Sequence, residues 1–413
     1  MKATYDVIII GAGPAGSVAA AYLQKQGKTV LVLEKMKFPR FVIGESLLPH
    51  CMDYLEKVDL VETVHEQKFQ LKTGVTFYHQ NEVCAFLFED RYTEGWDYTY
   101  QVKRADFDKA LIDEVAKREG VEVFFEAEVK AVKNSSTVQE VTFQYQNQTH
   151  CITAKFIMDA SGYGRVLPRL FNLDNPVNTP PRSAIFCHIE DQNRSNKAAQ
   201  NIFVHAFNDN KAWIWSIPFS DQTASVGVVG DTELIEEFEK NDGEKFREMV
   251  YQFPGLADRF KSSKFIFENR TITNYAVSVD QLYGDGFVLC GNSTEFLDPI
   301  FSSGVTLAIS SGYKAAELVD QQLNGQKVDW EKQYAEVLKS GINVFRSYVH
   351  AWYDGTLGTI FFSKDSNPEF KKQICSVLAG YVWDETNPFV KRHQTILEKL
   401  ARVIKIQEGA PLN

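Results

Sequence analysis

Apolar runs alternate with small and polar residues at the start of the chain, in the order expected of a strand, a helix and a second strand. Residues 7–10 form an uninterrupted apolar run, which is typical of a parallel strand buried on both faces. A helical pattern follows over residues 17–26, and residues 29–33 form the second apolar run. This order predicts a βαβ unit and hence an α/β fold.

Further along, residues 212–220 (AWIWSIPFS) alternate with the period of a strand. Trp213, Trp215 and Ile217 share one face, because successive side chains of a strand point in opposite directions. Pro218 lacks the backbone N–H that continues a ladder, so we expect the strand to end there. Two indoles on one face indicate either a slab of aromatic core or the wall of a site, and the strand by itself leaves both open.

Composition and charge narrow the class of protein. The chain has 413 residues, 44% hydrophobic and 24% charged, which suits a globular enzyme with more than one lobe. Its net charge of -10 argues against nucleic acid and anionic membranes as partners. The six cysteines include no C-x-x-C pair, and no apolar run approaches the roughly 20 residues of a membrane span. We therefore expect reduced thiols, no membrane span and a cytoplasmic location.

Three glycines follow the first predicted strand. Gly11, Gly13 and Gly16 have G-x-G-x-x-G spacing, and Glu34 ends the second strand. The glycines permit a tight turn, the approach of a pyrophosphate to the backbone, and close packing of helix and strand. The carboxylate accepts a hydrogen bond from an adenosine ribose. The spacing alone is weak evidence, but between two strands and closed by an acid it predicts a dinucleotide site.

Two later segments favour FAD as the dinucleotide. Residues 156–165 (FIMDASGYGR) have the pattern of a strand that ends in a glycine turn, and residues 285–319 that of a strand, a loop and a long helix beginning near Ser303. Backbone N–H groups at such a helix start stabilise the anionic pyrimidine side of a reduced flavin. No second G-x-G-x-x-G occurs. We therefore expect a separate NAD(P)H flavin reductase to supply the reducing equivalents.

Four stretches resemble the flavin-dependent monooxygenase superfamily, which includes aromatic hydroxylases, geranylgeranyl reductases and halogenases. They are FPRFVIGESLLP (38–49), QVKRADFDKAL (101–111), DASG (159–162) and FLDPIFSSGV (296–305). WIWSIP (213–218) is similar to the W-x-W-x-I-P signature of flavin-dependent halogenases, and FLDPIFSSG to their F-x-x-P-x-x-S-x-G motif. The chain thus resembles a flavin-dependent halogenase over nearly its whole length.

The resemblance implies halogenation with reduced FAD, O2 and a chloride or bromide ion. In this family a flavin C4a-hydroperoxide forms, and a halide held by backbone N–H groups, here near Ser303 and Gly304, attacks it to release hypohalous acid. The tryptophan strand, residues 213–218, then acts as a barrier that keeps the organic substrate from the flavin. Only the small oxidant crosses the protein to the aromatic ring.

Lys72 lies in FQLKTGVTF (69–77), which resembles the stretch that carries the catalytic lysine of the family. In one continuous strand Lys72 shares a polar face with Gly74 and Thr76, which by itself indicates an ordinary solvated residue. The resemblance instead implies that Lys72 is catalytic. Its ammonium donates to hypohalous acid, or its neutral amine is halogenated to a haloamine.

The resemblance also implies a set of cofactor-binding residues. They are Gly11, Gly13, Ala15, Gly16, Glu34, Lys35, Arg40, Glu45, Ser46, Arg104, Asn292, Pro299, Gly304 and Val305. Arg40 and Arg104 lie where basic side chains of the superfamily contact FAD, and Glu45 lies in a loop beside the flavin. The eight histidines have no metal-ligand spacing, so we expect no metal site.

The sequence departs from the family in ways that bear on its substrate. Phe301 stands where tryptophan halogenases carry a glutamate, which points to the branch that acts on phenols and pyrroles. Asn292 replaces the usual aspartate, and 413 residues is short for a halogenase. The ring is either free or tethered to an acyl carrier protein. A basic amphipathic helix over residues 388–407 would suit an acidic carrier, although a plain surface helix is the simpler interpretation.

The implied fold is a Rossmann-like FAD-binding domain of the aromatic-hydroxylase type, with an inserted antiparallel sheet lobe and a helical C-terminal segment. We expect the FAD domain in residues 1–68, 104–165 and 281–335, the substrate-side lobe in 69–103 and 166–280, and helices in 336–413.

Two alternative functions stay open. One is an FAD-dependent aromatic monooxygenase, or a geranylgeranyl-reductase-like oxidoreductase, that uses no halide. The other is a flavin-binding protein without catalysis, in which Lys72 and the tryptophans are structural. A halide requirement separates the first from a halogenase, and fast reoxidation of added FADH2 by O2 argues against the second.

Overall fold

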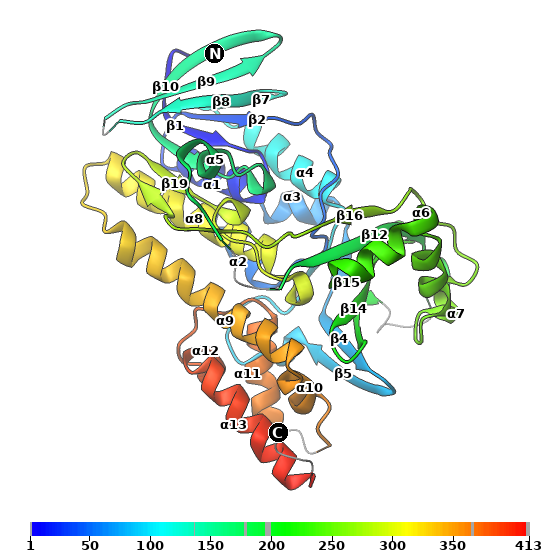
Figure 1. Ribbon diagram of the computed structural model, residues 1–413. Helices are drawn as coiled ribbons and strands as arrows, with labels where there is room; N and C mark the ends of the chain where they lie inside the picture. Colours follow the sequence, from blue (N-terminus) through cyan, green and yellow to red (C-terminus); the bar gives the residue numbers. More distant parts are fainter. Residues whose placement is uncertain (1, 136, 177–179, 195–199, 365–366, 410–413) are drawn as a thin grey trace.

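The protein was analysed as a computed structural model, which describes residues 2–135, 137–176, 180–194, 200–364 and 367–409. Two large sheets organise the chain, and a group of helices from its C-terminal part gathers at the bottom of the view in Figure 1. None of the helices in the described ranges is both long and apolar enough to cross a membrane.

The first sheet has eight strands and contains the start of the chain. Its main path runs β18 (Tyr283–Gly284), β19 (Phe287–Leu289), β10 (Gln148–Asp159), β1 (Thr4–Ile10), β2 (Val30–Glu34) and β7 (Val121–Phe125), and β8 (Glu128–Lys133) pairs with β9 (Gln139–Tyr145) beside β10. The pairs from β19 through β7 are parallel, so their carboxyl ends meet at one edge. Ligands of open α/β sheets bind at that edge.

Three helices pack on the first sheet, namely α1 (Pro14–Lys25), α4 (Arg104–Ala116) and α8 (Ser303–Leu323). Two shorter helices lie against them, α2 (His50–Lys57) on α8 and α3 (Val61–Glu66) on α4. α1 begins at Pro14, earlier than the apolar pattern predicts, because proline has the backbone angle of a first helical turn and needs no N–H there. α1 packs closely on α8, where a Cβ at Gly312 would lie 2.4 Å from the carbonyl oxygen of Ala15.

The second sheet has seven strands. Their order is β16 (Arg270–Ile272), β12 (Arg182–Glu190), β15 (Thr223–Asp231), β14 (Ala212–Pro218), β13 (Ile202–Phe207), β4 (Gly74–His79) and β5 (Glu82–Leu87). It is antiparallel as expected, except that β13 and β4 are parallel. On one face Ile214 packs in a core with α6 (Thr232–Gln252), while Trp213 and Trp215 on the other face join the main core of the molecule.

The expected single strand over residues 69–77 is wrong. The chain forms β3 (Gln70–Lys72), which pairs with β6 (Thr99–Gln101) in a separate two-stranded ribbon, and only then enters β4. The Asn201 side-chain oxygen accepts hydrogen bonds from the backbone N–H groups of Thr73 (2.8 Å) and Gly74 (3.1 Å). These hydrogen bonds fix Thr73 as an interruption between the two strands. The side-chain alternation of β3 therefore does not continue into β4.

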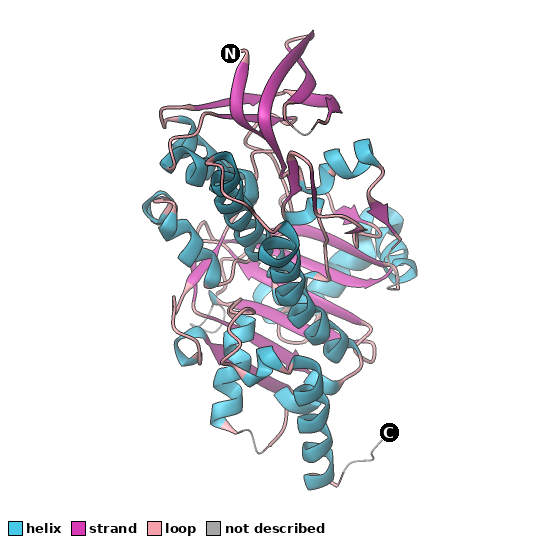
Figure 2. Ribbon diagram, turned by 90° about the vertical axis from the view of Figure 1, so that its left-hand side faces the viewer, coloured by secondary structure: helices cyan, strands magenta, loops and turns pink. Residues whose placement is uncertain are grey.

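The C-terminal part is helical. It contains α9 (Glu336–Tyr353), α10 (Thr356–Phe361), α11 (Pro368–Leu378), α12 (Pro388–Lys391) and α13 (His393–Gln407). The single helix expected over residues 388–407 is wrong, because Arg392 leaves the helical conformation between α12 and α13. Figure 2 shows this helical group beyond the second sheet, at the end opposite the N-terminus.

Short elements complete the described chain. They are α5 (Val166–Phe171), α7 (Ala257–Phe260), β11 (Asp174–Asn175), β17 (Ser278–Val279), the 3-10 turns at 88–90, 162–164, 291–293 and 299–301, and a π-helical turn at 331–335. The expected domain boundaries stay a prediction, and residues 1, 136, 177–179, 195–199, 365–366 and 410–413 of those ranges lie outside the described residues.

Candidate active site

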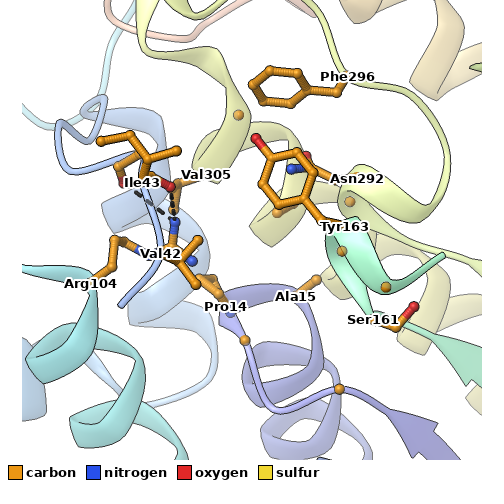
Figure 3. A pocket seen from close by; sticks show the side chains of 18 of the residues that line it. Pro14, Ala15, Val42, Ile43, Arg104, Ser161, Tyr163, Asn292, Phe296 and Val305 are labelled. Carbon is orange, nitrogen blue, oxygen red and sulfur yellow. Dashed lines mark hydrogen bonds between the residues drawn. The ribbon is translucent and has the colours of Figure 1, made fainter. Parts of the chain in front are cut away.

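A cavity of about 720 Å³ extends from the carboxyl edge of the first sheet to β14 of the second. Its wall combines the glycine turn before α1, the loop of residues 40–46, the start of α8, and β14. Figure 3 shows Ala15, Tyr163 and Asn292 around this space, each from a different element. The fold therefore gathers segments that are far apart in the sequence around one chamber.

The glycine turn between β1 and α1 has no room for side chains at two positions. Gly11 has φ +102°, and a Cβ there would lie 2.5 Å from the carbonyl oxygen of Ala160. A Cβ at Gly16 would lie 2.0 Å from the carbonyl oxygen of Gly11. Gly13 and Ala15 form the cavity wall beyond the turn. The backbone is thus exposed to the cavity, as an approaching pyrophosphate requires.

Glu34 lies in the cavity wall at the end of β2. Its two carboxylate oxygens accept hydrogen bonds from the backbone N–H groups of Ala12 (2.9 Å) and Met36 (2.8 Å). A carboxylate offers about four acceptor sites, so a ribose hydroxyl would still find one. Lys35 is also in the wall, but its side chain is mostly exposed and pairs with Glu128 at 3.0 Å.

Two wall arginines share one buried carboxylate. Asp108 on α4 accepts from Arg40 Nη1 at 2.9 Å, and from Arg104 Nε and Nη2 at 2.8 and 2.9 Å. Arg104 also donates to the carbonyl oxygen of Ile43 at 3.2 Å, which ties α4 to the loop of residues 40–46 (Figure 3). Two guanidinium groups against one carboxylate leave this wall with excess positive charge, which suits the pyrophosphate of FAD.

The loop of residues 40–46 is fixed to the second sheet by Glu45. Its carboxylate lies 2.8 Å from Nε2 of His188 on β12, and both side chains are buried. His188 was not predicted as a site residue, because a lone histidine in a strand has no distinguishing local pattern. Glu45 and Ser46 both belong to the cavity wall. The Glu45–His188 pair thus holds the loop against the chamber.

The start of α8 presents backbone N–H groups to the cavity. Ser302 precedes the helix in the left-handed conformation with φ +56°, and Asp298 caps the preceding turn by accepting from Ile300 N at 3.1 Å. Ser303 and Gly304 are in the wall and in the first turn, where N–H groups have no partner within the helix. The same wall includes Asn292, Pro299 and Val305.

The tryptophan strand forms a further part of the wall. Trp213, Trp215 and Ile217 all line the cavity, and the two indole rings lie 5.6 Å apart. Gly227 on β15 makes room for Trp215, because a Cβ there would lie 2.3 Å from the indole ring. Pro218 is the last residue of β14, as the sequence predicts, and is not in the wall. The strand is therefore both core and wall.

One hydroxyl connects the tryptophan strand to the α8 start. Tyr353 Oη accepts from Trp213 Nε1 at 3.0 Å and donates to Asp298 Oδ2 at 2.7 Å. Tyr275 Oη donates to the same carboxylate at 2.9 Å, and burial raises the pKa of Asp298 above its usual range. Tyr353 was not predicted as a site residue, because a lone tyrosine in a helix has no distinguishing local pattern.

Lys72 is enclosed, whereas the strand pattern by itself indicated a solvated residue. Its side chain is 1% exposed, and Nζ donates to the carbonyl oxygen of Leu47 at 2.7 Å. Nζ also lies 5.5 Å from the centre of the Phe88 ring. Burial lowers the pKa of Lys72 to about 7. Lys72 is not part of the cavity wall, unlike most of the other expected site residues.

No group of three or more histidine, cysteine, aspartate or glutamate side chains is arranged to hold a metal ion in the part of the chain that the structure describes. The chemistry of the cavity wall suits a flavin dinucleotide. It combines exposed backbone in the glycine turn, a carboxylate at the end of β2, and the two arginine side chains that share Asp108.

Comparison with known proteins agrees with this fit. Residues 4–333 match the family described as FAD binding domain. A pyrrole-2-carbonyl-[peptidyl-carrier protein] chlorinase from Pseudomonas fluorescens is 28% identical, over 98% of this chain and 94% of its own. The solved structure of the flavin-dependent brominase Bmp2 is 26% identical with a TM-score of 0.84, over 98% of this chain and 100% of its own. The chain belongs to the flavin-dependent halogenase family of FAD-binding proteins.

A further solved structure, a flavoprotein/dehydrogenase from Cytophaga hutchinsonii, is 49% identical with a TM-score of 0.95, over 98% of this chain and 100% of its own. The chain matches the chlorinase and Bmp2 in length, but its match spans only 63% of a tryptophan 2-halogenase from Chondromyces crocatus, so it is short beside some members of the family, as expected. Membership of the family agrees with the W-x-W-x-I-P and F-x-x-P-x-x-S-x-G motifs, both of which contribute residues to the cavity wall.

Proposed function

We propose that this protein halogenates an electron-rich aromatic ring of the phenolic or pyrrole type, using FADH2, O2 and chloride or bromide. The observation that supports it most is the division of the site into two parts. The tryptophan wall and the α8 start face one cavity, while the one enclosed amine of the expected site lies outside that cavity. Such a division suits a reaction in which a small oxidant, and not the substrate, meets the flavin.

FAD supplies the electrons that activate O2 when it is bound. The glycine turn, Glu34 and the arginine pair would hold its adenosine and pyrophosphate, and the remaining wall its flavin half. Ser303 and Gly304 offer N–H groups and the positive end of the α8 dipole, which together suit a halide ion. Trp213 and Trp215 exclude an organic ring from that end of the cavity.

Lys72 receives the oxidant in this proposal. Hypohalous acid transfers its halogen to the neutral amine, so an N–halogen bond forms, the O–halogen bond breaks and water leaves. The aromatic carbon then takes the halogen, and its ring proton is lost as the amine is restored. A pKa of about 7 makes the neutral amine available at physiological pH, because burial penalises the ammonium form.

The partners follow from the same proposal. A separate NAD(P)H flavin reductase delivers FADH2. Two relatives, the chlorinase and a brominase from Pseudoalteromonas luteoviolacea, act on a pyrrole-2-carbonyl group held by a peptidyl carrier protein. We infer a carrier-tethered ring as the first substrate to test here, with free phenols as the second.

A second candidate is oxidation or reduction without halide, because the relative from Cytophaga hutchinsonii is described as a flavoprotein/dehydrogenase. One experiment separates the two. The protein is incubated with FADH2, O2 and bromide, with phenols and a carrier-bound pyrrole-2-carbonyl thioester, and the products are measured by mass spectrometry. Brominated product that disappears without bromide is expected. Hydroxylated product in both arms would reject the halogenase and support the second candidate.

A further inference from the structure

Lys72 belongs to the two-stranded ribbon of β3 and β6, and the loop at Ser46 pairs with the other edge of β6. One face of this three-segment arrangement is polar. In this ribbon Lys72 on β3 lies opposite Thr99 on β6, and Gln101 on β6 lies opposite Ser46 in the neighbouring loop. Directly opposed residues of antiparallel chains point to the same side, and residues two apart on one strand share a face. The side chains of Ser46, Lys72, Thr99 and Gln101 therefore all lie on one face.

The backbone contacts bring the Ser46 and Gln101 side chains close together. Leu47 N donates to the Tyr100 carbonyl at 3.1 Å, and Val102 N donates to the Glu45 carbonyl at 2.8 Å. These bonds flank the pair on both sides, which is the arrangement with the shorter separation of side chains. Nζ of Lys72 reaches the Leu47 carbonyl in the loop on the other side of β6, so the lysine side chain crosses over β6.

Four polar atoms on this face have no protein partner. Within the described ranges no hydrogen bond is made by Ser46 Oγ, Thr99 Oγ1, Gln101 Oε1 or Gln101 Nε2. The three side chains are at most 5% exposed. A buried polar group without a partner costs about 1–3 kcal/mol, and small polar molecules normally satisfy such groups. Three neighbouring side chains of this kind on one face indicate binding sites for small polar molecules such as water.

The polar face connects the cavity to the lysine. Ser46 is part of the cavity wall, whereas Gln101, Thr99 and Lys72 are not. The order Ser46, Gln101, Thr99 and Lys72 follows the pairing of the ribbon from its cavity side inward. On the opposite face lie Leu71 and Tyr100, which alternate with these residues along the two strands.

The chemistry of the three side chains suits a hydroxylic oxidant. Hypohalous acid is neutral, donates one hydrogen bond and accepts others, as water does. Hydroxyl and amide groups match both functions. Thiols and thioethers are the side chains that oxidants attack most readily, and the three side chains between cavity and lysine include neither.

We propose that Ser46, Gln101 and Thr99 bind small hydroxylic guests in a row that leads from the cavity to Lys72, water in the resting enzyme and hypohalous acid during turnover. The part about hypohalous acid rests on the proposed function. The three residues act by directing the oxidant to the amine before it escapes to solvent.

The first experiment follows the oxidant. FADH2, O2 and bromide are added without an aromatic substrate, the protein is desalted rapidly, and its bound oxidising equivalents are titrated with iodide per FADH2 consumed. Wild-type protein is expected to retain bound oxidant that Lys72→Leu loses. Thr99→Val and Gln101→Leu should retain about tenfold less, the value of one hydrogen bond of ordinary strength, with the balance in the filtrate.

Tyr100→Phe is the matched control, because it removes a hydroxyl from the same strand on the opposite face. It should retain the wild-type amount. The proposal is overturned if Thr99→Val and Gln101→Leu, folded as judged by circular dichroism, also retain the wild-type amount.

The second experiment does not depend on activity. A high-resolution crystal structure of the full-length wild-type protein should show ordered water about 2.7–3.2 Å from Thr99 Oγ1 and from the Gln101 amide. The absence of ordered water at these atoms would overturn the proposal that the three side chains bind small hydroxylic molecules. Water at these atoms, in a protein that generates no oxidised bromine at all, would uphold the guest sites and reject the halogenase proposal.

Discussion

Asp298 and Trp213 are held together by one hydroxyl, although they lie on different elements of the cavity wall. Tyr353 Oη donates to Asp298 at 2.7 Å and accepts from Trp213 Nε1 at 3.0 Å. The loop that leads into α8 and the tryptophan strand are therefore positioned by the last turn of α9. Both motifs of the family depend on a helix that neither motif contains.

Tyr353→Phe should weaken this arrangement. It leaves a buried carboxylate and an indole N–H each short of a partner, so we expect the free energy of unfolding to fall by about 1–3 kcal/mol. We also expect the KM for bromide to rise several-fold. Tyr348→Phe is the matched control, because Tyr348 on the same helix is buried and its hydroxyl has no hydrogen-bond partner within the described residues. Urea denaturation of the two variants measures the difference, and equal losses would contradict the role of Tyr353.

Lys72→Met should abolish the transfer of halogen to the ring. We expect halogenated product per FADH2 consumed to fall by about 10²–10³, the usual loss when a catalytic contact is removed. Lys332→Met, which changes an exposed lysine, serves as the control. Mass spectrometry of the product gives the ratio, and near wild-type product from Lys72→Met would remove Lys72 from the mechanism.

The stability of the protein should depend on pH through Lys72. Burial lowers its pKa from 10.5 to about 7, so between these values the unfolded chain binds a proton that the folded chain does not. The free energy of unfolding contributed by Lys72 therefore rises as the pH rises through this window, by roughly a few kcal/mol in total. Denaturation of wild type and Lys72→Met at about pH 7 and about pH 9.5 measures it. A difference between the two proteins that stays constant with pH would show an unshifted lysine.

Product yield should follow the same titration. If the neutral amine takes the halogen, product per FADH2 consumed rises as the pH increases from about 6 to about 8, because the amine loses its proton near pH 7. Measurement in single turnovers avoids the pH dependence of a reductase. A yield that falls over this range would assign Lys72 the role of an ammonium donor instead.

Glu34→Gln should weaken FAD binding. The carboxylate accepts two backbone hydrogen bonds and faces the cavity, whereas an amide offers one oxygen and loses the charge. We expect the Kd for FAD to rise about tenfold or more, since hydrogen bonds to a charged group are worth about 1.5–3 kcal/mol. Glu128→Gln, at the exposed rim of the same cavity, should change it little. Fluorescence titration with FAD compares the two, and equal effects would argue against a specific role for Glu34.

The sequence by itself determined the features that depend on local pattern. The glycine turn, the alternation of the tryptophan strand up to Pro218, and the start of α8 at Ser303 each follow from backbone conformation and side-chain period within about ten residues. These motifs predicted the flavin-binding cavity wall because parallel strands bring their carboxyl ends to one edge.

Only the tertiary structure decided the surroundings of Lys72 and the contacts that hold the two motifs. The strand is interrupted at Thr73, whose backbone N–H is held by Asn201. As a result Lys72, which the strand pattern alone would place in water, is an enclosed amine whose pKa is lowered. The Glu45–His188 pair and the Tyr353–Asp298 bond likewise join distant segments. Local periodicity carries no information on such partners, because burial and hydrogen bonding are set by whichever segment packs against a residue.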